Sequence, residues 1–395
     1  MESETIFTRL FSNKIQLLLL WCLVATIMLP SIIHFSPVAL IFCLSTFSLF
    51  KENVADLWRR SRIVWVGFSL FVLTGIMFSQ LPEKSIKGGY DIIRHLFLFA
   101  FITPLITKST DKDIAKSIGY FASIIGLIFF LVVLSVQLTE ETLFIRGSNI
   151  GYTIWGSHNL LSTGVTVFFI LTLSSIATKN IPIKFSAFPL LFLAYCMVFI
   201  LSRGNLVAAG GIGLFLLFYY FSLSYKYLLV LLSTLLLVYF YLFFILYCED
   251  NSCPHSLFPR QYIYQSTLSY IYEKPIFGYG FSVFKIISGI QENGINVVMP
   301  HNLSLDLMYS VGLFGAAAWV ITIFTWFYNS GWTFSKINSR NKLPLPIIIA
   351  ISLFIYLFIR GLFDLKLVSS QTFGLLAVIF AFIYSRKPTD EMNEL

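Results

Sequence analysis

Residues 116–138, KSIGYFASIIGLIFFLVVLSVQL, carry one charge, on Lys116, ahead of a long and mainly apolar stretch. A helix needs about 20 such residues to cross the hydrocarbon core of a bilayer. This stretch therefore predicts a transmembrane helix, and comparable stretches recur along the whole chain.

The composition indicates a polytopic membrane protein. Of the 395 residues, 57% are hydrophobic and 12% are charged, against about 25% charged in a soluble protein. Mean hydropathy is +0.82. The net charge of +8 could suggest a nucleic acid or an anionic surface, but the basic residues lie mostly in short segments between apolar runs. Membrane topology explains them better, so we expect membrane lipids and no nucleic acid as partners.

Apolar runs predict an all-α fold with about twelve transmembrane helices. The first run lacks a small-residue cleavage site after it, so we expect a retained span rather than a signal peptide. The expected spans are 15–33, 37–50, 63–79, 92–106, 116–138, 158–177, 185–202, 204–221, 227–247, 302–327, 344–359 and 367–385.

The distribution of Lys and Arg predicts the orientation. With the N-terminus inside, the larger share of the 27 basic residues falls on inner segments, including KENVADLWRRSR (51–62). Short cytoplasmic loops carry such an excess. Twelve spans also return the C-terminus to the cytoplasm. We divide the chain into residues 1–247, with nine helices, an outer loop region, 248–301, and residues 302–395, with three helices and a cytoplasmic tail.

The outer loop region is much longer than a usual connection. Its sequence PRQYIYQSTLSYIYEKPIFGYGFSVF (259–284) has helix-like apolar spacing up to Lys274, then Pro and Gly. It predicts a membrane-parallel helix followed by a glycine-rich turn. Cys248 and Cys253 could form a small disulfide if this loop is extracytoplasmic.

Arg203 lies in a hairpin between two apolar runs, SRGN, with almost no loop. Its guanidinium is expected at membrane depth or just above it. An interfacial anchor is one interpretation; the favoured one is an anion site, because a guanidinium fork suits phosphate oxygens. Arg260 opens the expected outer helix. Alone it indicates a solvated charge, and it gains weight if Arg203 and His301 converge on the same site.

His301, in MPHNLSLDLMYSVGLFG (299–315), precedes the tenth span. All five histidines fall near the outer face, so position does not single it out. An interfacial residue is the ordinary interpretation, but an imidazole, titrating near pH ~6.5, is also a natural general base. Asn302 could be the helix N-cap. Asp306 could orient His301 or be a buried structural acid.

The remaining charged residues indicate no metal or nucleotide site. Asp111 and Asp113 in STDKDIAK predict a helix cap on the inner side. The outer carboxylates form no recognisable metal constellation, and no Walker loop or dinucleotide fingerprint occurs. Arg360 and Asp364 are four residues apart and predict an ion pair, with substrate contact as the alternative. We expect metal-independent chemistry without a cofactor.

Together these motifs resemble a family. The SRG hairpin (202–204), an arginine in a long outer loop, PIFGYGFSVF and PHNLSLDLMYSVGLFG, with Gly312 and Gly315, are similar to the O-antigen ligase and polymerase superfamily of Gram-negative inner membranes, most closely the ligases. The family's usual loop tryptophan is absent; RQYIYQ offers Tyr262 and Tyr264 instead.

The resemblance implies a GT-C-like helical enzyme that acts on the periplasmic side. We also expect the protein to act as a monomer. It implies inverting, metal-independent transfer of O-antigen polysaccharide from undecaprenyl pyrophosphate to a sugar hydroxyl of lipid A-core. It further implies catalytic roles for His301, Arg203 and Arg260. Both arginines are also expected to bind substrate, together with Asn302 and Asp364.

Three other functions compete with ligation. An O-antigen polymerase would extend the glycan on its lipid carrier, and a protein O-oligosaccharyltransferase would need a protein-recognition module, which the sequence does not indicate. A transporter or lipid-glycan flippase predicts repeat symmetry and charges at midplane depth. Here the notable charges gather near one face and one loop makes the halves unlike, which favours an enzyme.

Overall fold

The computed structural model describes residues 12–28, 35–140, 158–200, 202–221, 258–292, 295–297, 299–329, 343–363 and 365–386. Its helices are α2 (Asn13–Met28), α3 (Phe35–Met77), α4 (Pro82–Lys108), α5 (Asp111–Glu140), α7 (His158–Ala177), α8 (Ile183–Ile200), α9 (Arg203–Tyr220), α11 (Phe258–Glu273), α12 (Phe284–Ile287), α13 (Leu303–Asn329), α15 (Leu345–Phe363) and α16 (Ser370–Ser385).

The expected all-α membrane fold is confirmed. Within the described residues, six helices are long and apolar enough to cross a membrane, and shorter apolar helices accompany them. The only strands in that part of the chain are β1 (Gln291–Glu292) and β2 (Ile295–Asn296), which pair antiparallel. The span expected at 227–247 and the cysteines Cys248 and Cys253 lie outside the described residues.

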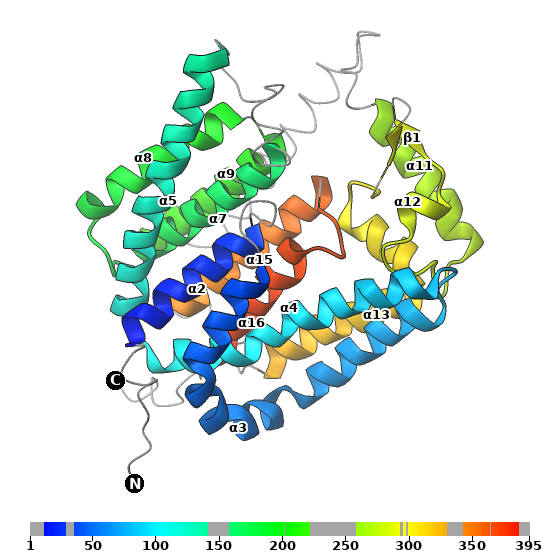
Figure 1. Cartoon of the computed structure of the whole chain (residues 1–395), viewed down its shortest axis with the longest axis horizontal. Helices are drawn as coiled ribbons and strands as arrows, with labels where there is room; N and C mark the ends of the chain where they lie inside the picture. Colours follow the sequence, from blue (N-terminus) through cyan, green and yellow to red (C-terminus); the bar gives the residue numbers. More distant parts are fainter. Residues whose placement is uncertain are drawn as a thin grey trace.

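The predicted loop 51–62 is wrong, because α3 continues through it as helix. The segment contains no Gly or Pro, and most of its residues are good helix formers. Asp56 and Arg60 add an ion pair one turn apart, at 2.9 Å. The spans expected at 37–50 and 63–79 are therefore two parts of one helix, whose ribbon changes direction at the lower edge of the molecule (Figure 1).

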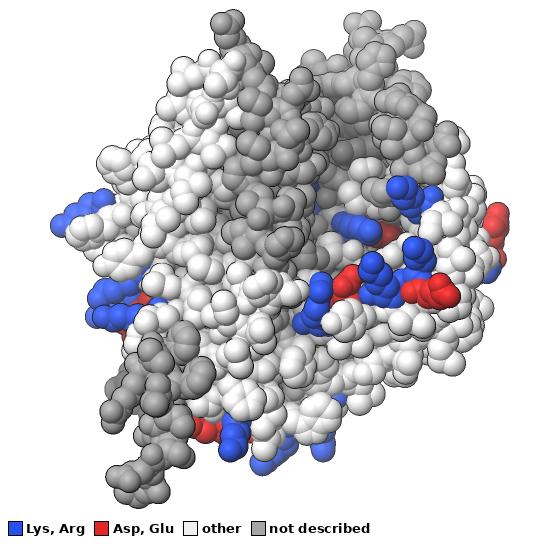
Figure 2. Space-filling view, viewed as in Figure 1, with Lys and Arg blue, Asp and Glu red and all other residues white. Residues whose placement is uncertain are grey.

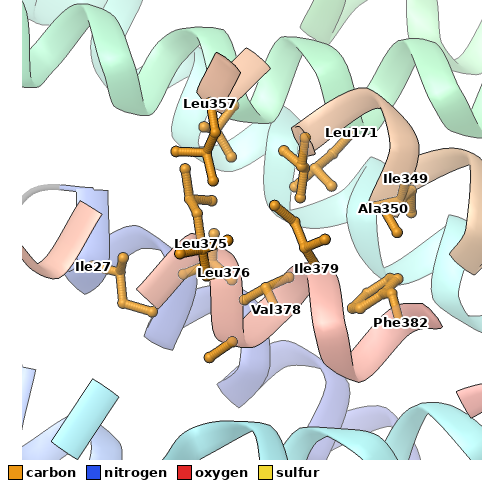
Figure 3. Close-up of a cluster of buried hydrophobic side chains, with 14 of the residues drawn as sticks. Ile27, Leu171, Ile349, Ala350, Leu357, Leu375, Leu376, Val378, Ile379 and Phe382 are labelled. Carbon is orange, nitrogen blue, oxygen red and sulfur yellow. The ribbon is translucent and has the colours of Figure 1, made fainter. Parts of the chain in front are cut away.

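The helices form two groups. Helices α3, α4, α13 and α16 pack together, as do α5, α7, α8 and α9, and α2 and α15 contact members of both groups. Figure 3 shows the apolar side chains where α16 meets its neighbours: Leu375 and Ile379 of α16 lie among Ile27 of α2, Leu357 of α15 and Leu171 of α7. All five are buried.

The connections separate into two ends of the bundle. At one end, Arg386 donates to the carbonyls of Ile106, Thr107 and Ser109 and pairs with Asp111 at 3.1 Å. Asp111 also accepts from the Leu345 amide. These segments were all expected on the inner side, so their grouping is confirmed, while their placement in the cytoplasm stays a prediction.

The expected outer segments meet at the other end. Gln80 donates to the Tyr279 carbonyl at 3.1 Å, and Gln371 donates to the Met28 carbonyl at 3.1 Å. Helices α11 and α12 lie at this end, beyond the start of α4 (Figure 1). Charged side chains are concentrated at the lower and left edges of the molecule and in a band near the start of α4 and α11–α12 (Figure 2).

Candidate active site

His301 lies at the outer end, immediately before α13. Its backbone has φ 56°, in the left-handed region, which is sparsely used by residues other than Gly, Asn, Asp and His. Pro300 before it is buried, and His301 itself is half-buried. Such backbone conformations persist where the surroundings enforce them, often at functional sites.

Asn302 fixes the start of α13 behind His301. Its side-chain oxygen accepts from the amides of Ser304 at 2.9 Å and Leu305 at 3.1 Å, so the predicted N-cap is confirmed. Its amide nitrogen donates to the Leu362 carbonyl at 3.2 Å. One side chain therefore both caps α13 and attaches it to the end of α15.

Asp306 serves as a buried structural acid, the second of the two roles considered for it. It is 6% exposed. One carboxylate oxygen accepts from the Leu367 amide at 2.8 Å, and the other faces the Ser310 hydroxyl at 3.5 Å. The carboxylate therefore holds the segment between α15 and α16 against the first turns of α13.

The glycine-rich turn predicted after α11 is present, and its carbonyls accept hydrogen bonds from α13 amides at a kink in that helix. Gly312 has φ 61° and ψ −168°, a conformation that is essentially restricted to glycine. The helix kinks there, and the amides of Leu313 and Phe314 donate to the carbonyls of Pro275 and Ile276, at 2.8 and 3.0 Å. A Cβ on Gly312 would collide with the Ile276 carbonyl.

On the other side of the kink, amides of the same turn donate hydrogen bonds to carbonyls of α13. The amides of Tyr279 and Gly280 donate to Tyr309 and Ser310, each at 2.8 Å. The Tyr279 and Tyr309 rings stack with centroids 4.8 Å apart. The Tyr279 hydroxyl donates to Glu273 at 2.8 Å. Burial, and then this bond, raises the pKa of Tyr279. PIFGYGF and the start of α13 are thus one rigid unit.

Helix α11 attaches Arg260 to this unit. Arg260 lies in its first turn, and Tyr264, one turn later, donates from its hydroxyl to the His301 carbonyl at 3.4 Å. The structure thus brings the Arg260 turn and His301 into one neighbourhood. The side-chain position of Arg260 lies outside the described part.

Arg203 is the first residue of α9, and Ser202 is its N-cap residue. Helix α8 ends at Ile200, so the tight hairpin is confirmed. The Ser202 hydroxyl accepts from the side-chain amide of Asn205 at 3.1 Å, and the Asn205 oxygen accepts from the Tyr356 hydroxyl at 2.8 Å. The backbone start of α9 is therefore attached to α15; the Arg203 side chain is not described.

Helix α15 is the element that joins the two motif segments, and the sequence did not predict this. Tyr356 is fully buried, and Arg360, 3% exposed, lies one turn later within hydrogen-bonding reach of the Tyr356 hydroxyl, as does Thr163 of α7. Gly361 packs against Leu303, the first residue of α13. The sequence signal was the pair of polar residues Tyr356 and Arg360, four apart in the otherwise apolar sequence IYLFIRG (355–361).

Other predicted residues are placed differently or not described. Asp364 lies outside the described residues, so its pairing with Arg360 stays a prediction. His95 is buried within α4, 2% exposed, with Nδ1 2.6 Å from the Asp91 carbonyl. His34 and His255 lie outside the described residues, and the His158 side chain is not described. Thr110 and Asp113 form the predicted cap of α5, at 2.7 and 3.2 Å.

Within the described residues, no group of three His, Cys, Asp or Glu side chains is arranged to hold a metal ion. A cavity of about 290 Å³ lies between α3, α4 and α16, at the end opposite His301. It contains none of the predicted site residues.

Comparison with known proteins supports the resemblance. A model of the O-antigen ligase family matches residues 188–320, from within α8 to within α13. This range contains Arg203, Arg260 and His301, together with the glycine-rich turn. The match covers roughly a third of the chain and supports the predicted resemblance to the O-antigen ligase and polymerase superfamily. A search among curated proteins found no match.

Proposed function

We propose that this member of the O-antigen ligase and polymerase superfamily is an O-antigen ligase. It transfers O-antigen polysaccharide from undecaprenyl pyrophosphate to a sugar hydroxyl of lipid A-core. The reaction takes place at the outer, periplasmic end of the bundle and inverts the anomeric carbon. It requires no metal and no cofactor.

One observation carries the proposal. The family match spans both motif segments, and α15 contacts both of them, through Tyr356 and Asn205 at the start of α9 and through Leu362 and Asn302 at the start of α13. Tyr264 adds the Arg260 helix to the same end. A basic residue at one helix start, an imidazole at another and a second arginine nearby suit a pyrophosphate donor.

The proposed chemistry is a direct displacement. The acceptor hydroxyl attacks the anomeric carbon of the donor, His301 takes its proton, and the bond between that carbon and the pyrophosphate oxygen breaks. Negative charge then develops on the departing undecaprenyl pyrophosphate. Arg203 and Arg260 neutralise that charge, and preorganised electrostatic stabilisation of this kind is often the largest catalytic contribution. A single base suits inversion, because no covalent intermediate is formed.

The direct test is reconstitution. Purified protein is incubated with an undecaprenyl-pyrophosphate glycan and lipid A-core in EDTA without ATP, and conjugated product is measured. We expect product formation. If the EDTA-treated protein forms no product and added Mg²⁺ restores product formation, the proposed metal independence is wrong. Chain extension of the donor without any conjugation to lipid A-core would assign the protein as the polymerase instead, and net lipid movement without product would favour a flippase.

Two variants test the residue roles. His301→Asn keeps a residue that tolerates the left-handed backbone but removes the base, and we expect loss of ligation with unchanged unfolding temperature. Arg203→Gln should also abolish ligation. Arg94→Gln is the control, because Arg94 is a partly exposed arginine that pairs with Asp91 near the middle of α4, outside both motif segments. Wild-type ligation by His301→Asn would overturn the assignment of the base.

A further inference from the structure

The cavity between α3, α4 and α16 lies at the inner end of the bundle, at the level where the helices end. Tyr384 and Ser385 close α16, and Thr107 is one residue before the end of α4. Asn53, Asp56 and Arg60 of α3 form the opposite wall. In a membrane-spanning bundle this is the depth of lipid headgroups rather than of acyl chains.

The wall of the cavity is electrically balanced but has hydrogen-bonding capacity left. Arg60 and Asp56 pair at 2.9 Å, and both side chains remain partly exposed. The Nε–H of Arg60 is buried and has no partner among the described residues. The Arg60 guanidinium also donates to the Tyr384 carbonyl at 3.5 Å. A guanidinium carries five N–H donors and a carboxylate about four acceptor positions, so these contacts leave both groups able to bind further.

The rest of the wall offers mainly acceptors. The Asn53 amide nitrogen donates one N–H to the Leu49 carbonyl at 2.8 Å, which leaves its other N–H and its oxygen. Pro104 has no N–H, so the carbonyl of Ala100 lacks its usual helical donor. The Thr103 hydroxyl donates to Phe99 at 2.7 Å, which leaves its lone pairs. A ligand that fits must therefore bring an anion for Arg60 and also N–H donors.

An apolar track continues from the cavity along α3 and α4. Phe50, one turn before Asn53, stacks on Phe101 with centroids 4.6 Å apart. Phe47 and Phe97 extend this cluster and are 54% and 49% exposed. A polar pocket with an exposed aromatic track on the membrane side matches a headgroup with acyl chains attached, rather than a small soluble ion.

We propose that this cavity is a binding site for a phospholipid with a phosphoethanolamine headgroup. The phosphate accepts from Arg60, and the primary ammonium donates to Asp56 and Asn53. An anionic headgroup without an amine would leave Asp56 facing negative charge. A choline headgroup has no N–H to donate. The site is distinct from the proposed donor site at the opposite end.

Lipid binding to the purified full-length protein tests this proposal. Phosphatidylethanolamine, phosphatidylcholine and phosphatidylglycerol with identical acyl chains are added separately in detergent, and bound lipid is counted by native mass spectrometry alongside the unfolding temperature. We expect phosphatidylethanolamine to bind at least about tenfold more tightly than phosphatidylcholine, as the loss of a charge-assisted hydrogen bond predicts. Equal binding of all three lipids would overturn the proposal.

Charge variants sharpen the test. Arg60→Gln should abolish the preference, and Asp56→Asn, which leaves the arginine, should shift the preference towards phosphatidylglycerol. Arg59→Gln, on the exposed neighbour, should change nothing. If Arg60→Gln fails to fold, Asp56→Asn alone decides, because an unchanged preference in that variant contradicts the proposed ammonium contact.

Two further experiments distinguish lipid binding from headgroup binding, and the lipid site from the proposed donor site. Soluble glycerophosphoethanolamine should not displace the lipid at equal concentration. Displacement would show that only the headgroup is recognised and that the aromatic track does not bind the acyl chains. Ligation by Asp56→Asn should equal that of the wild type in the reconstituted assay. Failure of the lipid site and failure of the proposed transfer reaction are thereby measured independently.

Discussion

The Tyr356 hydroxyl donates to the Asn205 side-chain oxygen at 2.8 Å, and both residues are fully buried. This bond joins α15 to the first turn of α9, where Arg203 is the first residue. It connects elements that are far apart in the sequence at the end of the bundle that also contains His301.

Tyr356→Phe should therefore weaken both stability and ligation. Losing the donor leaves the buried Asn205 oxygen unsatisfied, at a cost of about 1–3 kcal/mol in the free energy of unfolding. Because the start of α9 would loosen, we expect ligation to fall by more than this loss of folded protein explains. Thermal unfolding and ligation are measured on the same preparation.

Tyr195→Phe is the matched control. Tyr195 also donates to a side chain on another helix, Gln137, at 2.5 Å, but this pair joins α8 to α5 and does not involve α15. Its loss should lower the unfolding temperature without a specific effect on ligation. If both variants lose the same amount of ligation for each degree by which their unfolding temperature falls, the Tyr356–Asn205 bond acts on stability alone.

Two substitutions of Asp306 test whether it only stabilises the fold or also orients His301 for the reaction. Asp306→Asn keeps an oxygen for the Leu367 amide, which Asp306 accepts at 2.8 Å, so folding and ligation should remain close to those of the wild type. Asp306→Ala leaves that buried amide unsatisfied and should cost about 1–3 kcal/mol of stability. Loss of ligation in a fully folded Asp306→Asn protein would show that the negative charge itself serves the reaction.

Much of the architecture could be predicted because apolar periodicity and length identify membrane helices directly. The helix 258–273 and the following turn, the N-cap Asn302 and the tight hairpin before Arg203 also follow from local chemistry. The continuous helix through residues 51–62 could not be predicted. Its charge and polarity indicated a loop, although every residue there can be helical. The contact of α15 with both motif segments depends on tertiary packing, to which a single sequence offers no guide.

The role of Gly312 shows the same limit in a motif that the sequence did identify. In the sequence, Gly312 stood out only as part of the family resemblance. The structure shows that glycine is needed there for a backbone conformation and for the hydrogen bonds that the turn at Pro275 and Ile276 supplies. Gly312→Ala introduces both a strained φ of 61° and a clash with the Ile276 carbonyl. We expect a loss of more than about 2 kcal/mol of stability and loss of ligation, measured by unfolding in detergent.

Gly213→Ala is the control for Gly312→Ala. Gly213 lies in the middle of α9, and a Cβ there would meet nothing within 4 Å. Alanine should be neutral or stabilise the helix by up to about 1 kcal/mol. An equally stable and active Gly312→Ala protein would show that the kink is not required to hold His301.

Tyr264 provides the test of how α11 contributes to the site. Its hydroxyl donates to the His301 carbonyl at 3.4 Å, while Tyr262, on the same helix, is 58% exposed. Tyr264→Phe removes only this hydroxyl, so the unfolding temperature should change by a few degrees at most, since the bond is long. Because His301 has an unusual backbone conformation next to this contact, ligation should fall by about tenfold or less. Tyr262→Phe should leave ligation unchanged. A larger effect at Tyr262 than at Tyr264 would instead assign to Tyr262 the place of the tryptophan that the family usually has after its loop arginine.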